Sequence, residues 1–350
     1  PAGAYIVRTR DGVDAGAVAA DHGRRLGVRA RYVYRASTRG YAAEVTATQL
    51  AAVRRDRRVR AVEPDRPVHV RLSWGLDRID QAALPLDGRF RAPGDGAGTT
   101  IYVIDTGVRA THEQLAGRVE SGFDAVDGGA ADDCNGHGTH VAGIAAGATT
   151  GVASAAHVVA VRVLGCDGSG STSSVIAGID WVTAHHPAGR PAVANLSLGG
   201  GPSAALDEAV HRSIASGVTY VVAAGNGDAA GVGVSACGDS PARVRDAVTV
   251  GAAGRDDRAA PFSNFGSCVD VYAPGVDIPS AWDTGDRAEA TLSGTSMAAP
   301  FVAGAAAVYL GRHASASPAQ VERAVRAAAT VPVEVPGRRA RGRLLQLAGL

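Results

Sequence analysis

The sequence contains no lysine, a single methionine and only four cysteines, and it has no long apolar run. A membrane-spanning helix needs about 20 consecutive apolar residues. No stretch approaches that length, so we expect no membrane association. The opening PAGAYIV also lacks the charged-then-apolar pattern of a signal peptide, so any export signal is expected to have been removed already. With 350 residues, 46% hydrophobic and 20% charged, the chain can bury a sizeable core in one large domain and one small domain.

The cysteines are even in number, so no odd thiol needs an explanation. Two disulfides in an oxidising compartment are compatible with this count, although the sequence alone allows three pairings. A second interpretation concerns Cys134, His137 and His140, because thiolate and imidazole at this spacing can hold zinc. A zinc site needs a further ligand, and disulfides explain the cysteines better.

The net charge of +1 hides an uneven distribution. Residues 1–70 hold 14 Arg and 7 Asp or Glu, whereas residues 71–350 hold 21 and 27, so the first segment carries +7 and the second −6. A nucleic-acid-binding arm is one explanation, but the basic run at 54–58 has no interleaved aromatics and contains an acid. Coding bias toward Arg, a solvated helix face, or docking of one segment on the other explains the charge as well. We therefore expect no nucleic-acid partner.

The hydrophobic pattern changes near residue 70. Residues 1–70 contain strand and helix patterns typical of a small α+β unit. From Trp74 onward, buried apolar runs such as TTIYVIDTG, HVVAVRVLG and VTYVVAAGN alternate with helical stretches such as HGTHVAGIAAG and TSMAAPFVAGAAAVYLGRH. This alternation predicts an α/β fold for residues 71–350, with a mostly parallel sheet and helices on both faces. Ligands then bind at the carboxyl ends of the strands.

The tripeptide Asp-Thr-Gly occurs twice, beginning at Asp105 and at Asp283. Two such loops are what an aspartic protease needs, since two carboxylates that share a proton can activate water. However, Asp105 ends a buried strand whereas Asp283 lies in a polar loop, and the α/β alternation argues against an all-β protease. Asp105 by itself could also be an ordinary turn residue.

Two further segments give Asp105 a chemical interpretation. His137 lies among glycines in NGHGTHVAG, where a helix is expected to begin, and Ser296 lies at the start of another helix in SGTSMAAP. Ser293 or Thr295 is available to cap that second helix. An Asp, a His and a Ser in this order, each at a strand end or a helix start, suit nucleophilic catalysis.

Together, VIDTG, NGHGTHVAG and GTSMAAP resemble the three signature segments of the subtilisin-like serine proteases. WGLDRIDQ, DCNGHGTHVAG and FSNFGSCVDVYAPG resemble the proteinase K and aqualysin branch. The resemblance covers nearly all of residues 74–350, and residues 4–70 resemble the family's inhibitory propeptide. It implies a secreted, monomeric endopeptidase that acts on proteins and peptides, is inhibited by its own propeptide, and is cut within residues 68–74. A catalytically silent relative would have lost a triad residue, and none is lost.

The resemblance also implies roles for single residues. Ser296 would attack the peptide carbonyl, His137 would transfer the proton, Asp105 would orient the imidazole, and Asn226 would stabilise the oxyanion. An extended substrate would pair with two edges of the chain. The first specificity pocket would be walled by SLGG and AAGN, which hold no carboxylate, so a preference for apolar or aromatic residues before the cut is expected. The expected substrate-binding residues are Gly168, Ser169, Gly170, Ser197, Leu198, Gly199, Ala224 and Gly225.

Disulfides Cys134–Cys166 and Cys237–Cys268 and structural calcium are further implications of the resemblance. At the first calcium site, three oxygen-bearing residues fall at i, i+3 and i+4 of a short expected helix, and a fourth can fold back onto it. The expected ligands are Asp77, Asp80, Gln81 and Asp87 at this site, and Asp270 with the carbonyls of Arg245 and Ala247 at a second site.

Overall fold

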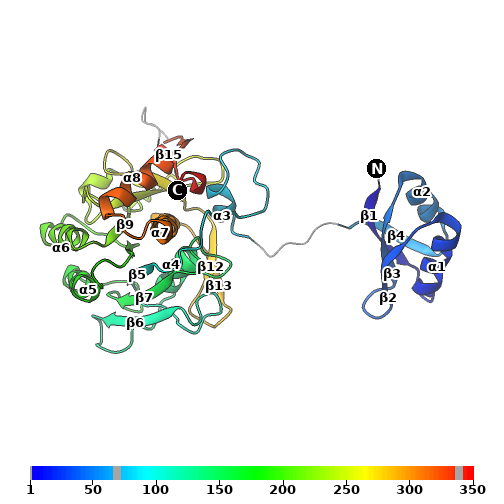
Figure 1. Cartoon of the computed structure of the whole chain (residues 1–350), viewed down its shortest axis with the longest axis horizontal. Coiled ribbons are helices and arrows are strands. Elements are labelled where there is room, and N and C mark those ends of the chain that lie inside the picture. Colours follow the sequence, from blue (N-terminus) through cyan, green and yellow to red (C-terminus); the bar gives the residue numbers. More distant parts are fainter. Residues whose placement is uncertain (1, 66–71, 336–341) are drawn as a thin grey trace. The chain divides into compact units, whose positions relative to one another are not determined.

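The computed structural model describes residues 2–65, 72–335 and 342–350. The chain divides into two compact units, Pro1–Val70 and Arg71–Leu350 (Figure 1). The expected cut at 68–74 falls largely outside the described residues. None of the helices in the described part of the chain is long and apolar enough to cross a lipid bilayer.

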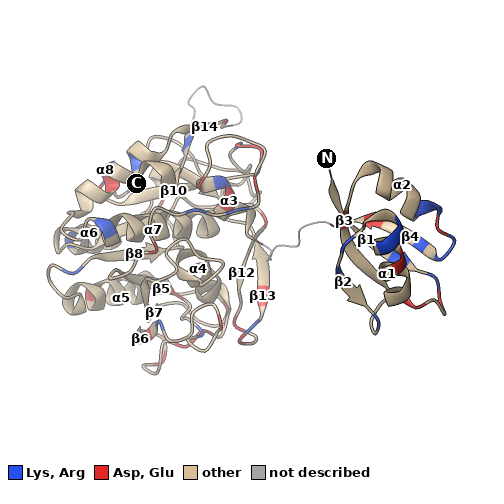
Figure 2. Ribbon diagram, turned by 45° about the vertical axis from the view of Figure 1, so that its right-hand side comes forward, with Lys and Arg blue, Asp and Glu red and all other residues tan. Residues whose placement is uncertain are grey.

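The smaller unit is a four-stranded antiparallel sheet in the order β2-β3-β1-β4, with two helices packed on it. Side-chain caps fix where these helices begin. Asp14 accepts hydrogen bonds from the N–H groups of the first turn of α1, and Thr46 forms a reciprocal capping box with Gln49 in α2. The basic run near the end of α2 is visible in Figure 2. The elements are β1 (Gly3–Thr9), α1 (Ala15–Leu26), β2 (Ala30–Tyr34), β3 (Gly40–Val45), α2 (Ala47–Arg55) and β4 (Val59–Pro64).

The larger unit is built on a nine-stranded sheet in the order β14-β15-β11-β10-β9-β8-β5-β7-β6. All neighbours pair in parallel except β14 and β15. Its strands are β5 (Thr100–Asp105), β6 (Val119–Asp124), β7 (His157–Arg162), β8 (Ala192–Leu196), β9 (Thr219–Ala223), β10 (Val248–Ala253), β11 (Val271–Pro274), β14 (Val331–Val333) and β15 (Gly342–Leu344).

Helices cover both faces of this sheet, as Figure 1 shows. On β5, Ile101 and Val103 pack on the side of α4 and α7, whereas Tyr102 and Ile104 pack on the side of α5 and α6. Central strands buried on both faces explain the near-continuous apolar runs in the sequence. The remaining elements are α3 (Trp74–Ile79), α4 (His137–Ala146), α5 (Thr172–His185), α6 (Ala204–Ala215), η1 (Ala236–Gly238), the hairpin β12 (Ile278–Ala281) and β13 (Glu289–Leu292), α7 (Thr295–Arg312), α8 (Pro318–Ala328) and η2 (Leu347–Gly349).

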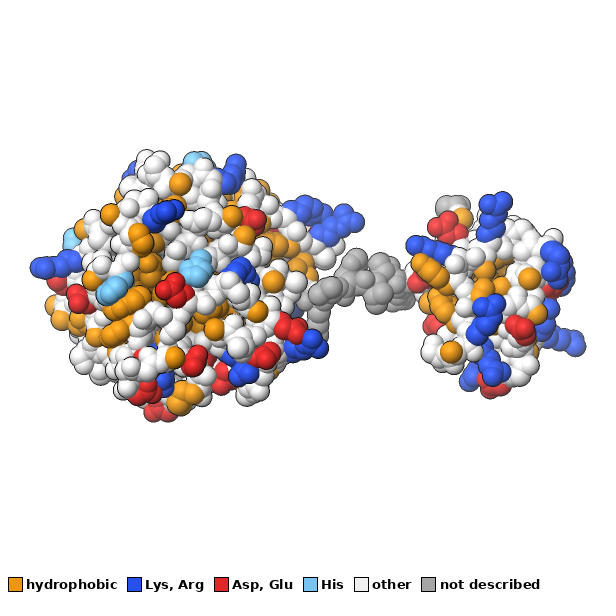
Figure 3. All heavy atoms as spheres, turned by 60° about the horizontal axis from the view of Figure 1, so that its bottom comes forward, with side chains coloured by type: hydrophobic (Ala, Val, Ile, Leu, Met, Phe, Trp, Pro, Cys, Tyr) orange, Lys and Arg blue, Asp and Glu red, His pale blue; other side chains and the backbone are white. Residues whose placement is uncertain are grey.

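The predicted fold class is confirmed. On the face shown in Figure 3, acidic and basic side chains are interspersed with hydrophobic ones on the larger unit. Phe301 of α7 is fully buried. A Cβ atom on Gly75 would lie only 2.4 Å from the Phe301 ring, so the ring packs directly against the backbone of α3 at this glycine.

Candidate active site

Asp105 and His137 meet at the carboxyl end of β5. Nδ1 of His137 lies 2.7 Å from Oδ1 of Asp105, whose side chain is fully buried. The same Oδ1 accepts a hydrogen bond from the N–H of Thr106 at 2.8 Å, while no described donor reaches the buried Oδ2. An imidazole that donates through Nδ1 keeps Nε2 free to accept a proton.

The glycines around His137 allow this approach. A Cβ atom on Gly138 would lie 2.1 Å from the carbonyl oxygen of Gly107 and 3.2 Å from Cβ of Asp105. Gly107 itself has a φ of 106°, in the region that favours glycine. The two segments therefore need glycine in order to bring His137 against Asp105.

The carboxylate of Asp133 joins the segments that carry Asp105 and His137. Both of its oxygens are fully used as acceptors just before the start of α4, where the helix dipole favours a negative charge. The donors are the hydroxyl of Thr106, the N–H groups of Asn135 and Gly136, and the N–H and hydroxyl of Thr139, at 2.6 to 2.9 Å. The sequence analysis missed Asp133, although an Asp shortly before a helix is a start signal.

These charges set the pKa of His137. Burial lowers the pKa, but the charge and hydrogen bond of Asp105 and the charge of Asp133 outweigh burial, so the net pKa lies above the usual 6.5. The protonated form of the His137 imidazole is thereby stabilised.

His140, one turn further along α4, has a structural role. Burial lowers its pKa to about 4, so the ring is neutral near pH 7. Its Nε2 lies 3.1 Å from the carbonyl oxygens of Ile278 and Ala290. His140 therefore ties α4 to β12 and β13. With Cys134 in a disulfide, the zinc interpretation fails.

Ser296 lies in the first turn of α7, and Asn226 lies in the loop after β9. Oδ1 of Asn226 accepts hydrogen bonds from the N–H and hydroxyl of Thr295 at 2.8 and 2.9 Å. Asn226 therefore caps α7. The expectation that Ser293 or Thr295 caps this helix through its own side chain was wrong. Because Thr295 holds Oδ1, the Nδ2 group of Asn226 is left to donate elsewhere.

Ser296 and Ser197 exchange two hydrogen bonds. Oγ of Ser296 donates to the carbonyl of Ser197 at 3.0 Å, and the Ser197 hydroxyl donates to the carbonyl of Ser296 at 2.7 Å. Among the hydrogen bonds of the described residues, none joins Ser296 to His137. Catalytic hydrogen bonds of this kind often form only when substrate binds.

Two neighbouring cavities share residues 198–201. The larger, about 620 Å³, is lined by His137 and by residues 168–172. The smaller, about 300 Å³, is lined by Ser296, Asn226 and residues 223–225. The sequence-predicted residues that line one or both cavities are Gly168, Ser169, Gly170, Ser197, Leu198, Gly199, Ala224 and Gly225.

The smaller cavity also contains a carboxylate that the sequence analysis missed. Asp239 follows η1 and is the one charged residue in the described lining of this cavity. The segments SLGG and AAGN do lack carboxylates, but a third wall comes from residues 239 and 242. No local pattern could have shown that this loop reaches a cavity built by earlier segments.

Comparisons with known proteins agree with this geometry. Residues 96–349 match the model of the subtilase family, and residues 5–71 match the model of the peptidase inhibitor I9 family. The chain belongs to the subtilase family. It is a serine peptidase by this membership, and the smaller unit is its I9-type propeptide domain.

Named relatives of this subtilase include serine proteinases. An extracellular serine proteinase from Thermus sp. (strain Rt41A) is 52% identical over 305 residues, which is 85% of this chain and 73% of that protein. Alkaline serine exoprotease A from Vibrio alginolyticus is 52% identical over 302 residues, covering 83% of this chain and only 55% of that protein. The crystal structure of a cold-adapted subtilisin-like serine proteinase matches with a TM-score of 0.74 and 50% identity, covering 79% of this chain and 98% of that chain.

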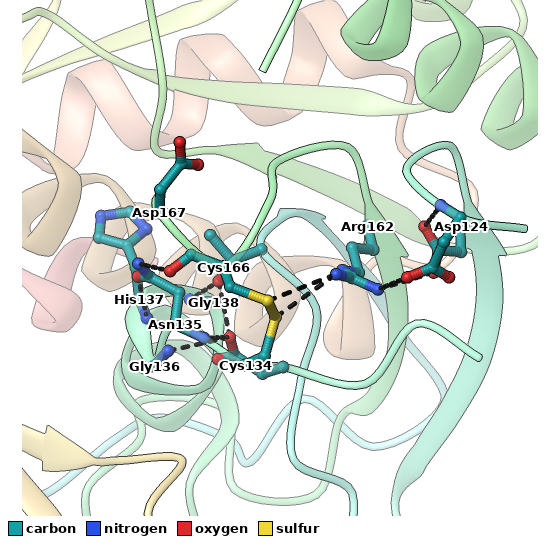
Figure 4. The surroundings of a disulfide bond; sticks show 12 residues. Asp124, Cys134, Asn135, Gly136, His137, Gly138, Arg162, Cys166 and Asp167 are labelled. Atoms are coloured by element: carbon teal, nitrogen blue, oxygen red, sulfur yellow. Dashed lines mark hydrogen bonds and ion pairs between the residues drawn. A yellow bond between two sulfur atoms is a disulfide. The ribbon is translucent and has the colours of Figure 1, made fainter. Parts of the chain in front are cut away.

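The subtilase domain contains two disulfides, Cys134–Cys166 and Cys237–Cys268. Figure 4 shows that the first lies between the turn that carries His137 and the guanidinium of Arg162. Arg162 contacts the Cys134 sulfur at 3.4 Å and forms an ion pair with Asp124 at 3.0 Å. On the other side, Asn135 donates to the carbonyl of Cys166 at 2.9 Å. The bridge thus connects the His137 turn with the segment that lines the larger cavity.

The residues expected at the first calcium site fit a cation in part. Asp77 and Asp80 each keep one buried oxygen that no described donor reaches. Burial and the charges of Asp77 and Asp87 raise the pKa of Asp80, although the N–H of Arg91 opposes this. However, α3 ends at Ile79, so Gln81 does not lie on the helix face. Its side-chain amide instead donates to the carbonyls of Ala83 and Pro85 and accepts from the N–H of Asp87.

The residues expected at the second calcium site fit less well. Oδ2 of Asp270 accepts from the N–H of Thr249 at 2.8 Å, and Oδ1 pairs with Arg326 at 3.0 Å. Both oxygens already have partners, and a guanidinium supplies the positive charge, so a cation beside the carbonyls of Arg245 and Ala247 would compete with Arg326. Within the described residues, no group of three or more His, Cys, Asp or Glu could hold a metal.

Proposed function

We propose that this protein hydrolyses peptide bonds through an acyl-enzyme, with Ser296 as nucleophile, His137 as general base and acid, and Asp105 as the group that orients the imidazole. The observation that supports it best is the 2.7 Å hydrogen bond between His137 and the buried Asp105, in a chain that also places Ser296 at the start of α7. Nε2 of His137 would accept the Ser296 proton and return it to the leaving amine, while Asp105 keeps the imidazole in place through Nδ1.

Two donors would stabilise the tetrahedral oxyanion. The N–H of Ser296 belongs to the first turn of α7 and has no partner within the helix. Nδ2 of Asn226 is oriented by the two hydrogen bonds that Thr295 gives to Oδ1. Fixed donors of this kind need no reorganisation during the reaction, and losing one costs about 10²–10³ in kcat.

An extended substrate would pair with residues 168–170 and 197–199, which line the two cavities. Backbone pairing of this kind gives affinity with little dependence on sequence. A substrate N–H that bonds to the carbonyl of Ser197 would displace Oγ of Ser296 from that acceptor. The nucleophile would then be free to turn toward His137.

The experiment is hydrolysis of casein by the purified protein. We expect activity that a serine-directed inhibitor abolishes, and that Ser296→Ala removes while Ser293→Ala retains. Ser293 is a suitable control because its hydroxyl contacts only Asp277 among the described residues. Hydrolysis that survives the serine inhibitor but stops on removal of zinc would overturn the proposal.

The smaller unit would act as an inhibitor and folding aid that is cut off on maturation, which the I9 match supports. The extracellular name of the Thermus relative and the two disulfides support secretion. We further propose that Asp77 and Asp80 hold a structural calcium ion with backbone carbonyls and water, since hard oxygens suit that ion. Binding to the folded state alone would raise stability by mass action.

A further inference from the structure

The smaller cavity beside Ser296 combines small apolar walls with one carboxylate. Its lining consists of alanines, glycines, Leu198 and a few hydroxyl or amide groups, and Asp239 is its only charge among the described residues. A Cβ atom on Gly225 would lie 3.4 Å from Oδ2 of Asp239. The carboxylate therefore approaches the wall that follows β9, next to the oxyanion residue Asn226.

Asn264 fixes the carboxylate in this position. This side chain is 1% exposed, and its Oδ1 accepts hydrogen bonds from the N–H groups of Gly227 and Val234 at 3.0 and 2.9 Å. Two backbone donors settle which end of the amide is the oxygen, so the Nδ2 group must face Asp239, to which it donates at 3.0 Å. One carboxylate oxygen is thus anchored.

No cation neutralises Asp239 among the described residues. The closest arginines in sequence are engaged elsewhere: Arg243 pairs with Asp207 at 2.6 Å, and Arg245 donates to the carbonyl of Ser267. Oδ1 of Asp239 accepts no hydrogen bond from the described residues. The cavity thus presents an anchored negative charge with an acceptor in need of a donor.

We propose that Asp239 is a specificity-determining residue, and that the enzyme prefers peptides with arginine or lysine immediately before the cleaved bond. This rests on the proposed function, because it takes Ser296 as the nucleophile and the adjacent cavity as the pocket for that side chain. It replaces the expected preference for apolar or aromatic residues.

The preference has two causes: a basic side chain gains an interaction with Asp239, and an apolar side chain loses free energy by burying that charge. A guanidinium or ammonium group can donate to Oδ1 and form a charge-assisted hydrogen bond, while its methylene stem packs on the alanines and glycines. A phenylalanine ring in the same cavity would exclude water from the carboxylate and give it no donor, which is costly for a charged group. Attraction of basic side chains and rejection of aromatic ones both increase the preference for arginine or lysine.

The test compares two p-nitroanilide peptides that are identical except for Arg or Phe at the last position. For the mature wild-type enzyme we expect kcat/KM to favour Arg by about 10-fold or more. Asp239→Asn and Asp239→Ala should reduce kcat/KM for Arg by about 10- to 100-fold and leave Phe equal or improved. Benzamidine, a small cationic probe, should inhibit the wild type and lose its effect in both variants.

Asp180→Asn is the matched control, because Asp180 is an exposed carboxylate on α5 that lines neither cavity. It should keep the wild-type ratio. A wild-type ratio that favours Phe overturns the inference without any variant, and so does an Arg preference that survives both Asp239 substitutions. Failure of the proposed function is distinct: neither peptide would be cleaved by folded wild-type enzyme, and no serine-directed inhibitor would label Ser296.

Discussion

At the scale of single residues, three carboxylates near the site differ in what surrounds them. Asp105 accepts from an imidazole, Asp133 accepts from five donors at a helix start, and Asp239 keeps one oxygen without a donor. The first suits orientation of a base, the second suits rigidity, and the third suits recognition of a cation. Residue type alone would have assigned all three to the surface.

We predict that Asp133→Asn lowers kcat by about 10- to 100-fold with little change in KM, because an amide cannot accept from all five donors and the turn before His137 loosens. The acidic limb of the kcat/KM profile should also move to lower pH. The charge of Asp133 raises the pKa of His137, so its removal lowers that pKa and leaves the base unprotonated in more acidic solution.

The groups that act on the charge of His137 are Asp105 on β5, Asp133 in the preceding loop, and His140 on α4, which is neutral near pH 7. Asp132→Asn is the control. Asp132 is the exposed neighbour of Asp133, and its carboxylate is not among the groups that shift the pKa of His137. If Asp133→Asn changed only the melting temperature, with both kcat and the acidic limb unmoved, Asp133 would be structural and not a positioning residue.

The sequence predicted those residues of the candidate site that a short local pattern marks. Asp105, His137 and Ser296 each stand at a strand end or helix start that composition reveals. Asp239 acts through a loop whose position depends on Asn264, 25 residues later in the chain, so no local window contains the signal. The capping role of Asn226 was missed for the same reason, since it lies 69 residues before the helix it caps.

At the scale of elements, the apolar helices and central strands were predictable because burial on both faces leaves continuous apolar runs. The edge strand β6 and the hairpin β12–β13 were missed, and so was α8. β6 reads VESGFD and β13 reads EATL, and both patterns are too polar or too short to indicate buried strands. Such elements depend on tertiary pairing more than on their own sequence.

The contact of α4 with the β12–β13 hairpin predicts an acid-sensitive stability. His140 has a folded-state pKa of about 4, below the ordinary 6.5 that it would have in the unfolded chain. Between these values the unfolded chain binds more protons, so the free energy of unfolding falls as the pH drops from 6.5 to 4, by on the order of 3 kcal/mol. Urea unfolding of Ser296→Ala protein at pH 7 and pH 4.5 measures this loss without autolysis.

His140→Gln should be less stable at pH 7 but should lose less stability on acidification, since the amide can still donate to Ile278 or Ala290 and does not titrate here. The control is His157→Gln, a half-exposed histidine on β7 that pairs with Glu120. An equal pH dependence in His140→Gln and the parent protein would contradict the assignment.

The end of α3 predicts calcium-dependent stability. In chelator, burial and the charge of Asp77 disfavour the charged form of Asp80, so replacing both carboxylates by neutral amides (Asp77→Asn with Asp80→Asn) should raise the half-life at high temperature. In calcium at 100 times its dissociation constant, the parent should gain about 2.7 kcal/mol, and the double variant should gain almost nothing. The measurement is thermal inactivation with and without calcium. A calcium gain that is unchanged in the double variant would locate the ion elsewhere.

At the scale of the whole molecule, the propeptide domain and the subtilase domain form separate compact units with opposite net charge. If the smaller unit inhibits the enzyme, as proposed above, it must be cut away before substrate can enter. The expected window 68–74 contains a single arginine, Arg71, and no lysine. If Asp239 selects a basic residue before the cut, Arg71 is the one basic residue in this window after which the enzyme could cut its own chain.

The last prediction is therefore that maturation depends on Ser296 and uses Arg71. Ser296→Ala should accumulate as the 350-residue chain, because it lacks the hydroxyl that we propose opens the junction. Mature wild-type enzyme added in trans should cut this chain, and N-terminal sequencing of the product should begin at Leu72. Arg71→Ala in an otherwise active chain should slow this cut by about 10-fold or more, whereas Arg60→Ala, outside the window, should not.

Release of the propeptide from purified Ser296→Ala at the wild-type rate would refute self-processing. A wild-type product that begins after an apolar residue, with Arg71→Ala processed normally, would instead show that the charge of Asp239 does not govern the enzyme's first substrate.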